Sequence, residues 1–147
     1  PLIIAEGYAT AKSLHAATGF TTVVAFDGGN LPVIAEAMRN QNPDRTIVIA
    51  ADDDEKRVEK LGHNPGLEAA KRAAERSNAQ ILKPSLTADE QMQGLTDHND
   101  VHVARGFDVF RREIRQQLSD LGISTSRGRS MQISPKKQKS QSNQMSV

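Results

Sequence analysis

Residues 46–54 read TIVIAADDD, an uninterrupted apolar run that stops at three consecutive aspartates. A strand that is apolar at every position is typical of a parallel sheet that is buried on both faces. In open parallel sheets, ligands bind at the carboxyl ends of the strands. This stretch therefore predicts the fold class, and it places Asp52, Asp53 and Asp54 at the edge of the sheet where a ligand would bind.

The rest of the chain alternates between short apolar strands and amphipathic helices. Strands are predicted over residues 2–5, 21–26, 46–51 and 79–82. Helices are predicted over 8–18, from 31 onward after Asn30, over 65–77 and over 99–118. A polar loop is expected over 53–64, and irregular chain or a weak helix over 85–96. This order predicts an α/β fold with a mostly parallel sheet of about four strands flanked by helices.

Composition excludes several classes of protein. The 147 residues contain no Cys, which excludes disulfides, zinc fingers and thiol catalysis and suits a cytoplasmic location. No apolar run approaches the ~18 residues of a membrane span, so we expect no membrane partner. The chain begins at Pro1 without Met, and we expect it to be a fragment of a larger protein.

The charges divide the chain into two parts. Residues 1–120 hold all 18 Asp and Glu and have a net charge of −4, whereas residues 121–147 have a net charge of +5. The second part is rich in Ser, Gln, Lys and Arg, a composition typical of disordered chain. We therefore predict one domain over 1–120 and a basic, disordered tail over 121–147.

Acidic residues follow several of the predicted strands. Glu6 ends the first strand, Asp52 and Asp54 end the third, and Asp97 and Asp100 open the last helix. Alternate residues of extended chain point the same way, so Asp52 and Asp54 can share a pocket from which Asp53 turns away. Carboxylates that converge repel one another, and Mg²⁺ is a natural counter-ion because it binds carboxylate oxygens, water and phosphate. Asp97 and Asp100 are equally suited to be ordinary helix caps, and both interpretations stay open.

Several motifs resemble one known family. Residues 6–11 read EGYATA, residues 52–54 supply an Asp-x-Asp element, and residues 97–100 match an Asp-x-Asn-Asp element that opens a helix. Together with Asn-Pro-Gly at 64–66, they resemble the TOPRIM domain of primases from conjugative plasmids and satellite phages. The resemblance spans about residues 2–106.

The resemblance implies a chemistry and a set of partners. In such domains the Asp-x-Asp acids bind Mg²⁺, with Mn²⁺ as an alternative ion, so Asp52 and Asp54 are the implied metal ligands. Glu6 is implied as the acid/base or as a further ligand, and Asp97 and Asp100 would extend the metal site. The implied function is Mg²⁺-dependent, primase-type nucleotidyl transfer on single-stranded DNA, in plasmid or phage replication or conjugative transfer. The implied partners are nucleoside triphosphates, single-stranded DNA and a relaxase, helicase or template-binding domain of the parent protein.

Four further residues are candidates for substrate binding. Lys12 and Lys83 are placed to meet a phosphate, and Gly28 and Gly29 would admit a closely approaching phosphate or strand backbone. An exposed helix lysine and a plain turn are the competing interpretations of Lys12 and of the glycines.

Two other functions remain open. A TOPRIM nuclease would use the same acids, because cutting and joining both act on metal-bound phosphates. A non-catalytic nucleic-acid-binding module attached to a relaxase would instead use the basic tail. A complete topoisomerase is excluded, because Tyr8 is the chain's one Tyr and lies inside the EGYATA motif.

Overall fold

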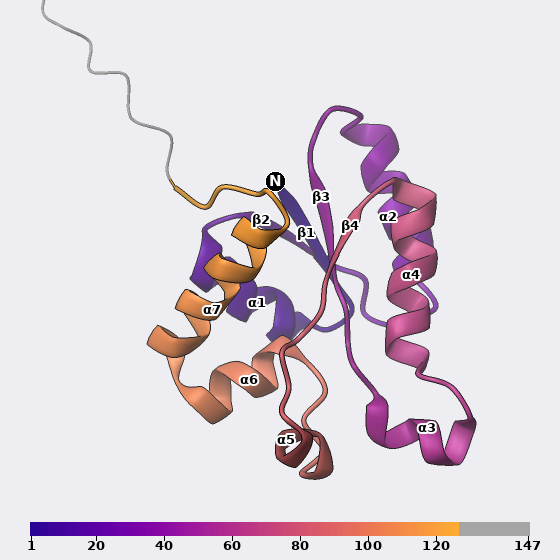
Figure 1. Ribbon diagram of the computed structural model, residues 1–147. Coiled ribbons are helices and arrows are strands. Elements are labelled where there is room, and N and C mark those ends of the chain that lie inside the picture. Colours follow the sequence, from indigo (N-terminus) through magenta and orange to yellow (C-terminus); the bar gives the residue numbers. More distant parts are fainter. Residues whose placement is uncertain (127–147) are drawn as a thin grey trace, which may run out of the picture.

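The computed structural model describes residues 1–126, and a four-stranded sheet lies at its centre (Figure 1). Its strands are β1 (Leu2–Ala5), β2 (Thr21–Val24), β3 (Ile47–Ala50) and β4 (Gln80–Leu82). They lie in the order β2-β1-β3-β4, and every neighbouring pair is parallel. The predicted fold class, an α/β fold with a parallel sheet of four strands, is confirmed.

Seven helices are described around this sheet. They are α1 (Tyr8–Thr18), α2 (Leu31–Gln41), α3 (Glu55–Leu61), α4 (Pro65–Ser77), α5 (Ala88–Met92), α6 (His98–Arg105) and α7 (Phe107–Asp120). In Figure 1, α1, α6 and α7 lie on one side of the sheet, and α2 and α4 lie on the other. Among the described residues, none of these helices is both long enough and apolar enough to cross a membrane.

Two hydrophobic cores explain why the central strands are apolar throughout. Ile3 and Ala5 of β1 face a core built with α1, α6 and α7, whereas Leu2 and Ile4 face a core built with α2 and α4. All four residues of β1 are buried, and so are all four of β3. Because alternate side chains enter opposite cores, a polar residue inside either strand would be buried without solvent.

The structure corrects two sequence predictions of local structure. The predicted loop over 53–64 contains α3, which ends at Gly62 with a φ of 74°. The predicted helix over 99–118 is two helices, because Gly106 has φ 82° and ψ 160°, a conformation outside the helical region. The break lets α6 stay at the carboxyl edge while α7 packs along α1.

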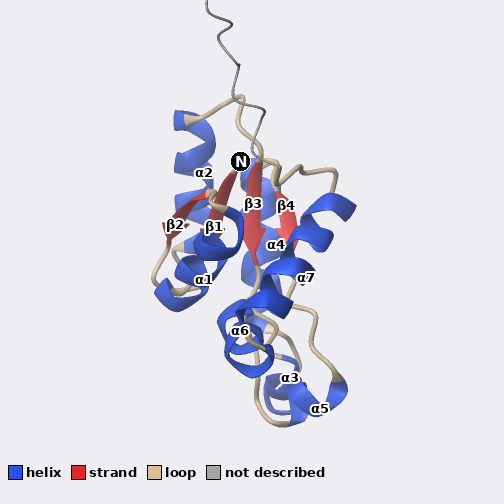
Figure 2. Cartoon of the chain, turned by 90° about the vertical axis from the view of Figure 1, so that its left-hand side faces the viewer, coloured by secondary structure: helices blue, strands red, loops and turns tan. Residues whose placement is uncertain are grey.

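The carboxyl ends of the strands form the edge that matters for function. Figure 2 shows α3, α5 and α6 gathered beyond the points of the strand arrows. The tail predicted over 121–147 lies outside the described residues from 127 onward. Before that point, Ile123 is still part of the core built with α1 and α7.

Candidate active site

The sheet brings the end of β1 next to the end of β3. Ala5 pairs with Ala50 in parallel register, so the chain leaves both strands side by side at the same edge. Glu6 directly follows β1, and Asp52 follows β3 after one intervening residue. Two acids that are far apart in the sequence thus meet because their strands are neighbours.

Asp52 lies in the most unfavourable electrostatic environment of this edge. Burial raises its pKa to about 7, and the charges of Glu6, Asp97, Asp54 and Asp100 add to the effect. Its Oδ1 atom is buried and has no hydrogen-bond partner among the described residues. A buried carboxylate oxygen without a partner is costly, so this atom is suited to a positively charged ligand.

Glu6 shares this environment. Burial raises the pKa of Glu6, and the carboxylates of Asp54 and Asp27 raise it further. The nearby backbone N–H of Gly28 partly opposes that rise in pKa. A Cβ atom at Gly28 would lie 3.4 Å from Oε2 of Glu6, an ordinary contact distance, so the β2–α2 turn lies against this carboxylate.

Asp54 is held by the start of α4. Its Oδ2 accepts a hydrogen bond from the Gly66 backbone N–H at 3.0 Å, and its own N–H donates to Asn64 Oδ1 at 3.0 Å. Gly66 also lies against the neighbouring acid, because a Cβ there would stand 2.6 Å from the backbone oxygen of Asp52. Sequence reasoning did not assign a site role to Asn64 or Gly66, although the Asn-Pro-Gly motif was the available signal.

Asp53 turns away from this group and makes its own contacts. It is only 1% exposed, and its carboxylate accepts from Asn64 Nδ2 at 2.8 Å and forms an ion pair with Lys83 Nζ at 3.2 Å. Lys83, a candidate for substrate binding, is thus engaged with Asp53 while half of its side chain remains exposed.

Asp97 and Asp100 form a capping box at the start of α6. Asp97 Oδ1 accepts from the Asp100 N–H at 2.8 Å, and Asp100 Oδ2 accepts from the Asp97 N–H at 3.3 Å and the Thr96 N–H at 2.8 Å. Burial raises the pKa of Asp97, and the hydrogen bond from the Asp100 N–H partly opposes that rise. The same two acids raise the pKa of Asp52, so capping and proximity to the site coexist.

The remaining candidates lie around this group rather than within it. Lys12 is exposed on α1 and lines a hollow of about 410 Å³ with Tyr8 and His102. Gly29 lies in a turn stabilised by Asp27, whose Oδ1 would be 3.1 Å from a Cβ atom at Gly29.

The donor set suits a hard divalent cation. Within residues 1–126, no three His, Asp or Glu side chains are grouped so that together they could hold a metal ion. Mg²⁺ requires no such cage, because it binds through one or two carboxylates and fills its other positions with water and phosphate oxygens. The unpartnered Oδ1 of Asp52, with Glu6 and Asp54 beside it, fits this mode of binding.

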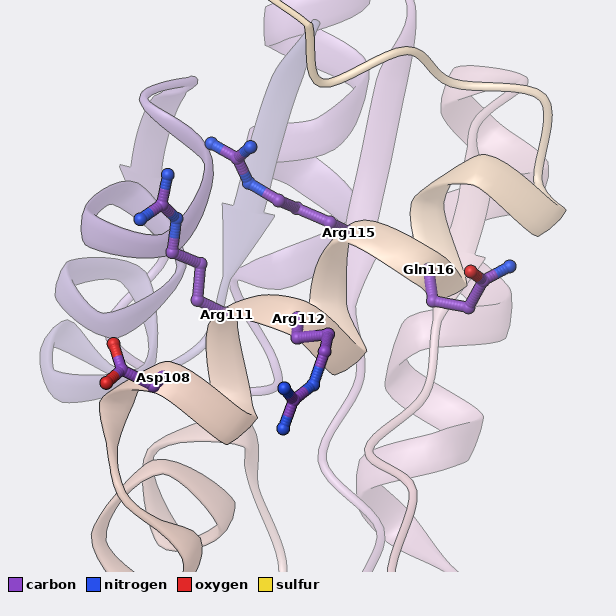
Figure 3. A pocket seen from close by; sticks show the side chains of 5 residues that line it. All are labelled: Asp108, Arg111, Arg112, Arg115 and Gln116. Carbon is purple, nitrogen blue, oxygen red and sulfur yellow. The ribbon is translucent and has the colours of Figure 1, made fainter.

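A second charged surface lies on α7. Arg111, Arg112 and Arg115 line a shallow hollow of about 440 Å³ with Asp108 and Gln116. Figure 3 shows Arg111 and Arg115 extending to the same side of α7 and Arg112 pointing away from them. None of the three guanidinium groups forms an ion pair with a carboxylate in the described part of the chain. This arrangement is suited to an extended polyanion.

Comparison with known proteins gives two kinds of match. A family model described as "Toprim domain" matches residues 1–108. Two proteins from Escherichia coli, both named DNA primase TraC, are 45% and 43% identical to this chain over 89 residues, or 60% of it. The match spans only 6% and 8% of the length of these relatives. No solved structure matches this chain.

Proposed function

This chain belongs to the Toprim domain family, and from that premise we propose that it is the catalytic module of a DNA primase. Membership confirms the resemblance indicated by EGYATA and the Asp-x-Asp element. The proposed reaction is metal-dependent joining of nucleotides on a single-stranded DNA template, inside a larger cytoplasmic protein of plasmid replication or conjugative transfer. The similarity to proteins named DNA primase TraC supports it. The observation that carries it is the buried, unpartnered Oδ1 of Asp52 among four other carboxylates.

Asp52 and Asp54 would hold Mg²⁺, or Mn²⁺ in its place, with Glu6, Asp97 and Asp100 close by. When bound, the ion would neutralise the triphosphate of an incoming nucleotide and stabilise the charge that develops during phosphoryl transfer. Asp54 keeps its position because the Gly66 N–H holds one of its oxygens.

Glu6 is the proposed proton acceptor. In the proposed step, the 3′-hydroxyl attacks the α-phosphorus, its proton passes to Glu6, and pyrophosphate leaves. A general base works best when its pKa approaches the operating pH, and burial beside Asp54 moves the pKa of Glu6 in that direction.

The proposed template partner has a suitable binding surface on α7. Its three arginines carry positive charge without a described acidic partner, so they are available to phosphates. The other proposed partners are nucleoside triphosphates and the remaining domains of the parent protein, whether relaxase, helicase or template-binding domain.

Primer synthesis by the full-length protein tests this function. With Mg²⁺, ribonucleotides and a single-stranded template, we expect Asp52→Asn and Glu6→Gln each to reduce synthesis at least about a hundredfold. Asp44→Asn is the matched control, because Asp44 is exposed and precedes β3 at the opposite edge of the sheet. Undiminished synthesis in both site variants would refute the proposal. Cleavage of single-stranded DNA with Mg²⁺ but no nucleotides would point to the nuclease instead.

A further inference from the structure

Two residues that lie close to Glu6 have exposed aromatic side chains. The chain has only one Tyr and four Phe and no Trp, yet Phe26 is 79% exposed and Tyr8 is 66% exposed. Aromatic rings usually contribute to a hydrophobic core, because burying their large apolar surface is favourable. In a chain with so few aromatic residues, two exposed rings are therefore unexpected. Packing within the described chain therefore does not account for either ring.

Phe26 also adopts an unfavourable backbone conformation. Its φ is 71°, and among the described non-glycine residues only Asn78 shares a positive φ. Asn78 is at the C-cap of α4, where Asn commonly adopts this conformation. Phe has no such preference for a positive φ, and the left-handed region costs a bulky residue about 1–2 kcal/mol. Such strain, on an exposed side chain, is typical of functional positions.

Backbone hydrogen bonds hold Phe26 next to Glu6. The Ala25 N–H donates to Ala5 O at 2.9 Å, and the Phe26 N–H donates to Glu6 O at 2.8 Å. The pairing of β1 with β2 thus continues past the sheet and ends at Glu6 itself. Tyr8 follows Glu6 by two residues and begins α1. Phe26 and Tyr8 therefore both lie close to Glu6, Phe26 across the β1–β2 pairing and Tyr8 two residues along the chain.

A positively charged side chain lies beside one of the two rings. Tyr8 lines a hollow with Lys12, whose ammonium group is a partner for a backbone phosphate. An unpaired nucleotide offers a flat aromatic base on one end and a phosphate on the other, which matches an exposed ring placed beside a lysine.

We propose that Phe26 and Tyr8 stack on unpaired bases of the single-stranded DNA held at the carboxyl edge. Stacking on aromatic side chains is tolerant of sequence, because every base has a π-face, and this suits an enzyme that copies different templates. The inference rests on the proposed function, since it assigns the rings to the same template strand.

Phe26→Gly separates a functional ring from a structural one. Glycine relieves the positive φ, so we expect the melting temperature to stay the same or rise. We expect the Kd for oligo(dT) to rise about tenfold, because one base no longer has a ring to stack on. Phe26→Trp and Tyr8→Phe keep a ring and should keep affinity, whereas Tyr8→Leu should weaken binding. Val103→Ala is the control, because it trims another apolar side chain that is 77% exposed.

Phe26→Trp also supplies a direct optical signal. It introduces the only Trp of this chain, and we expect oligo(dT) to quench its fluorescence while an abasic oligonucleotide of the same length and charge does not. Equal quenching by both, or unchanged oligo(dT) affinity in Phe26→Gly and Tyr8→Leu, would overturn the inference. The proposed function would survive that result if Asp52→Asn still abolished synthesis. If Asp52→Asn synthesised primers normally, the function itself would fail.

Discussion

Asp52 ties the stability of the protein to pH through one side chain. Its pKa is about 7 in the folded protein, against an ordinary value of 3.8, so the folded state holds its proton more tightly than the unfolded state does. The contribution of Asp52 to stability is therefore fully present below pH 3.8 and is lost as the pH rises to about 7.

We expect Asp52→Asn to remove this dependence in metal-free protein. Asn stays neutral, so the variant should gain stability relative to the natural chain as the pH rises from about 4.5 to about 7.5, by at most about 4 kcal/mol. Urea unfolding of both proteins in EDTA at the two pH values measures the difference between their free energies of unfolding. Taking this difference removes the contribution of titrating groups that both proteins share. A difference that does not change with pH would contradict the expectation.

Gly66 is a residue at which the absence of a side chain maintains the site. A Cβ atom there would lie 2.6 Å from the Asp52 backbone oxygen and 2.9 Å from the Asp52 Cβ, so Gly66→Ala must push α4 away from β3. We expect a decrease of about 1–3 kcal/mol in the free energy of unfolding, measured by urea denaturation. Gly7→Ala is the control, because Gly7 has φ −99° and a Cβ atom there would meet no heavy atom within 4 Å. Equal decreases in the two variants would show that crowding at Asp52 is not the cause.

At the scale of the element, Asp97 and Asp100 both cap α6 and place negative charge near Asp52. Asn caps a helix as well as Asp does, so Asp97→Asn should keep the hydrogen bond to Asp100 and change stability by less than about 0.5 kcal/mol. It removes one charge near Asp52, and we expect the Mg²⁺ concentration needed for half-maximal synthesis to rise about five- to tenfold. A magnesium titration of activity, paired with thermal unfolding, measures both. An unchanged magnesium requirement would show that Asp97 caps α6 but does not contribute to metal binding.

The outer face of α7 offers a second test at this scale. We expect Arg111→Gln combined with Arg112→Gln to weaken binding of single-stranded DNA and to lower the salt dependence, with a slope smaller by about 0.7 for each phosphate that is no longer neutralised. Lys71→Gln with Arg72→Gln is the control, because it removes the same charge from α4 on the other side of the sheet. Fluorescence anisotropy over a range of salt concentrations measures the slopes. Equal effects of the two double variants would indicate binding to net charge rather than to α7.

At the scale of the whole molecule, the family match ends before the fold does. The matched region stops at residue 108, yet α7 supplies Phe110, Ile114 and Leu118 to the core over β1 and β3. These side chains are at most 2% exposed, and burying each contributes about 1.5–3 kcal/mol, a sum comparable to the stability of a domain.

We therefore expect a chain of residues 1–108 to lack cooperative unfolding. A chain of residues 1–126 keeps every core residue that the structure describes, and we expect it to melt within a few degrees of the full chain. Calorimetry of the two truncations tests this expectation. A sharp transition in the shorter chain would show that α7 is dispensable for the fold.

Sequence reasoning succeeded where structure depends on neighbouring residues. The apolar runs predicted four parallel strands, and the break of the last helix at Gly106 was missed because one glycine in a periodic pattern is compatible with a continuous helix. The short α3 was missed because its exposed, charged residues carry no buried face.

The sequence by itself determined that strands alternate with helices, and that Glu6 and Asp52 stand at carboxyl ends of strands, because side-chain period and strand direction are local properties. Only the tertiary structure decided that β1 lies beside β3, that Asp53 pairs with Lys83, and that Phe26 bonds to the Glu6 backbone with its side chain exposed. Strand order, burial and the distances between charges depend on segments far apart in the chain, and no local pattern encodes them.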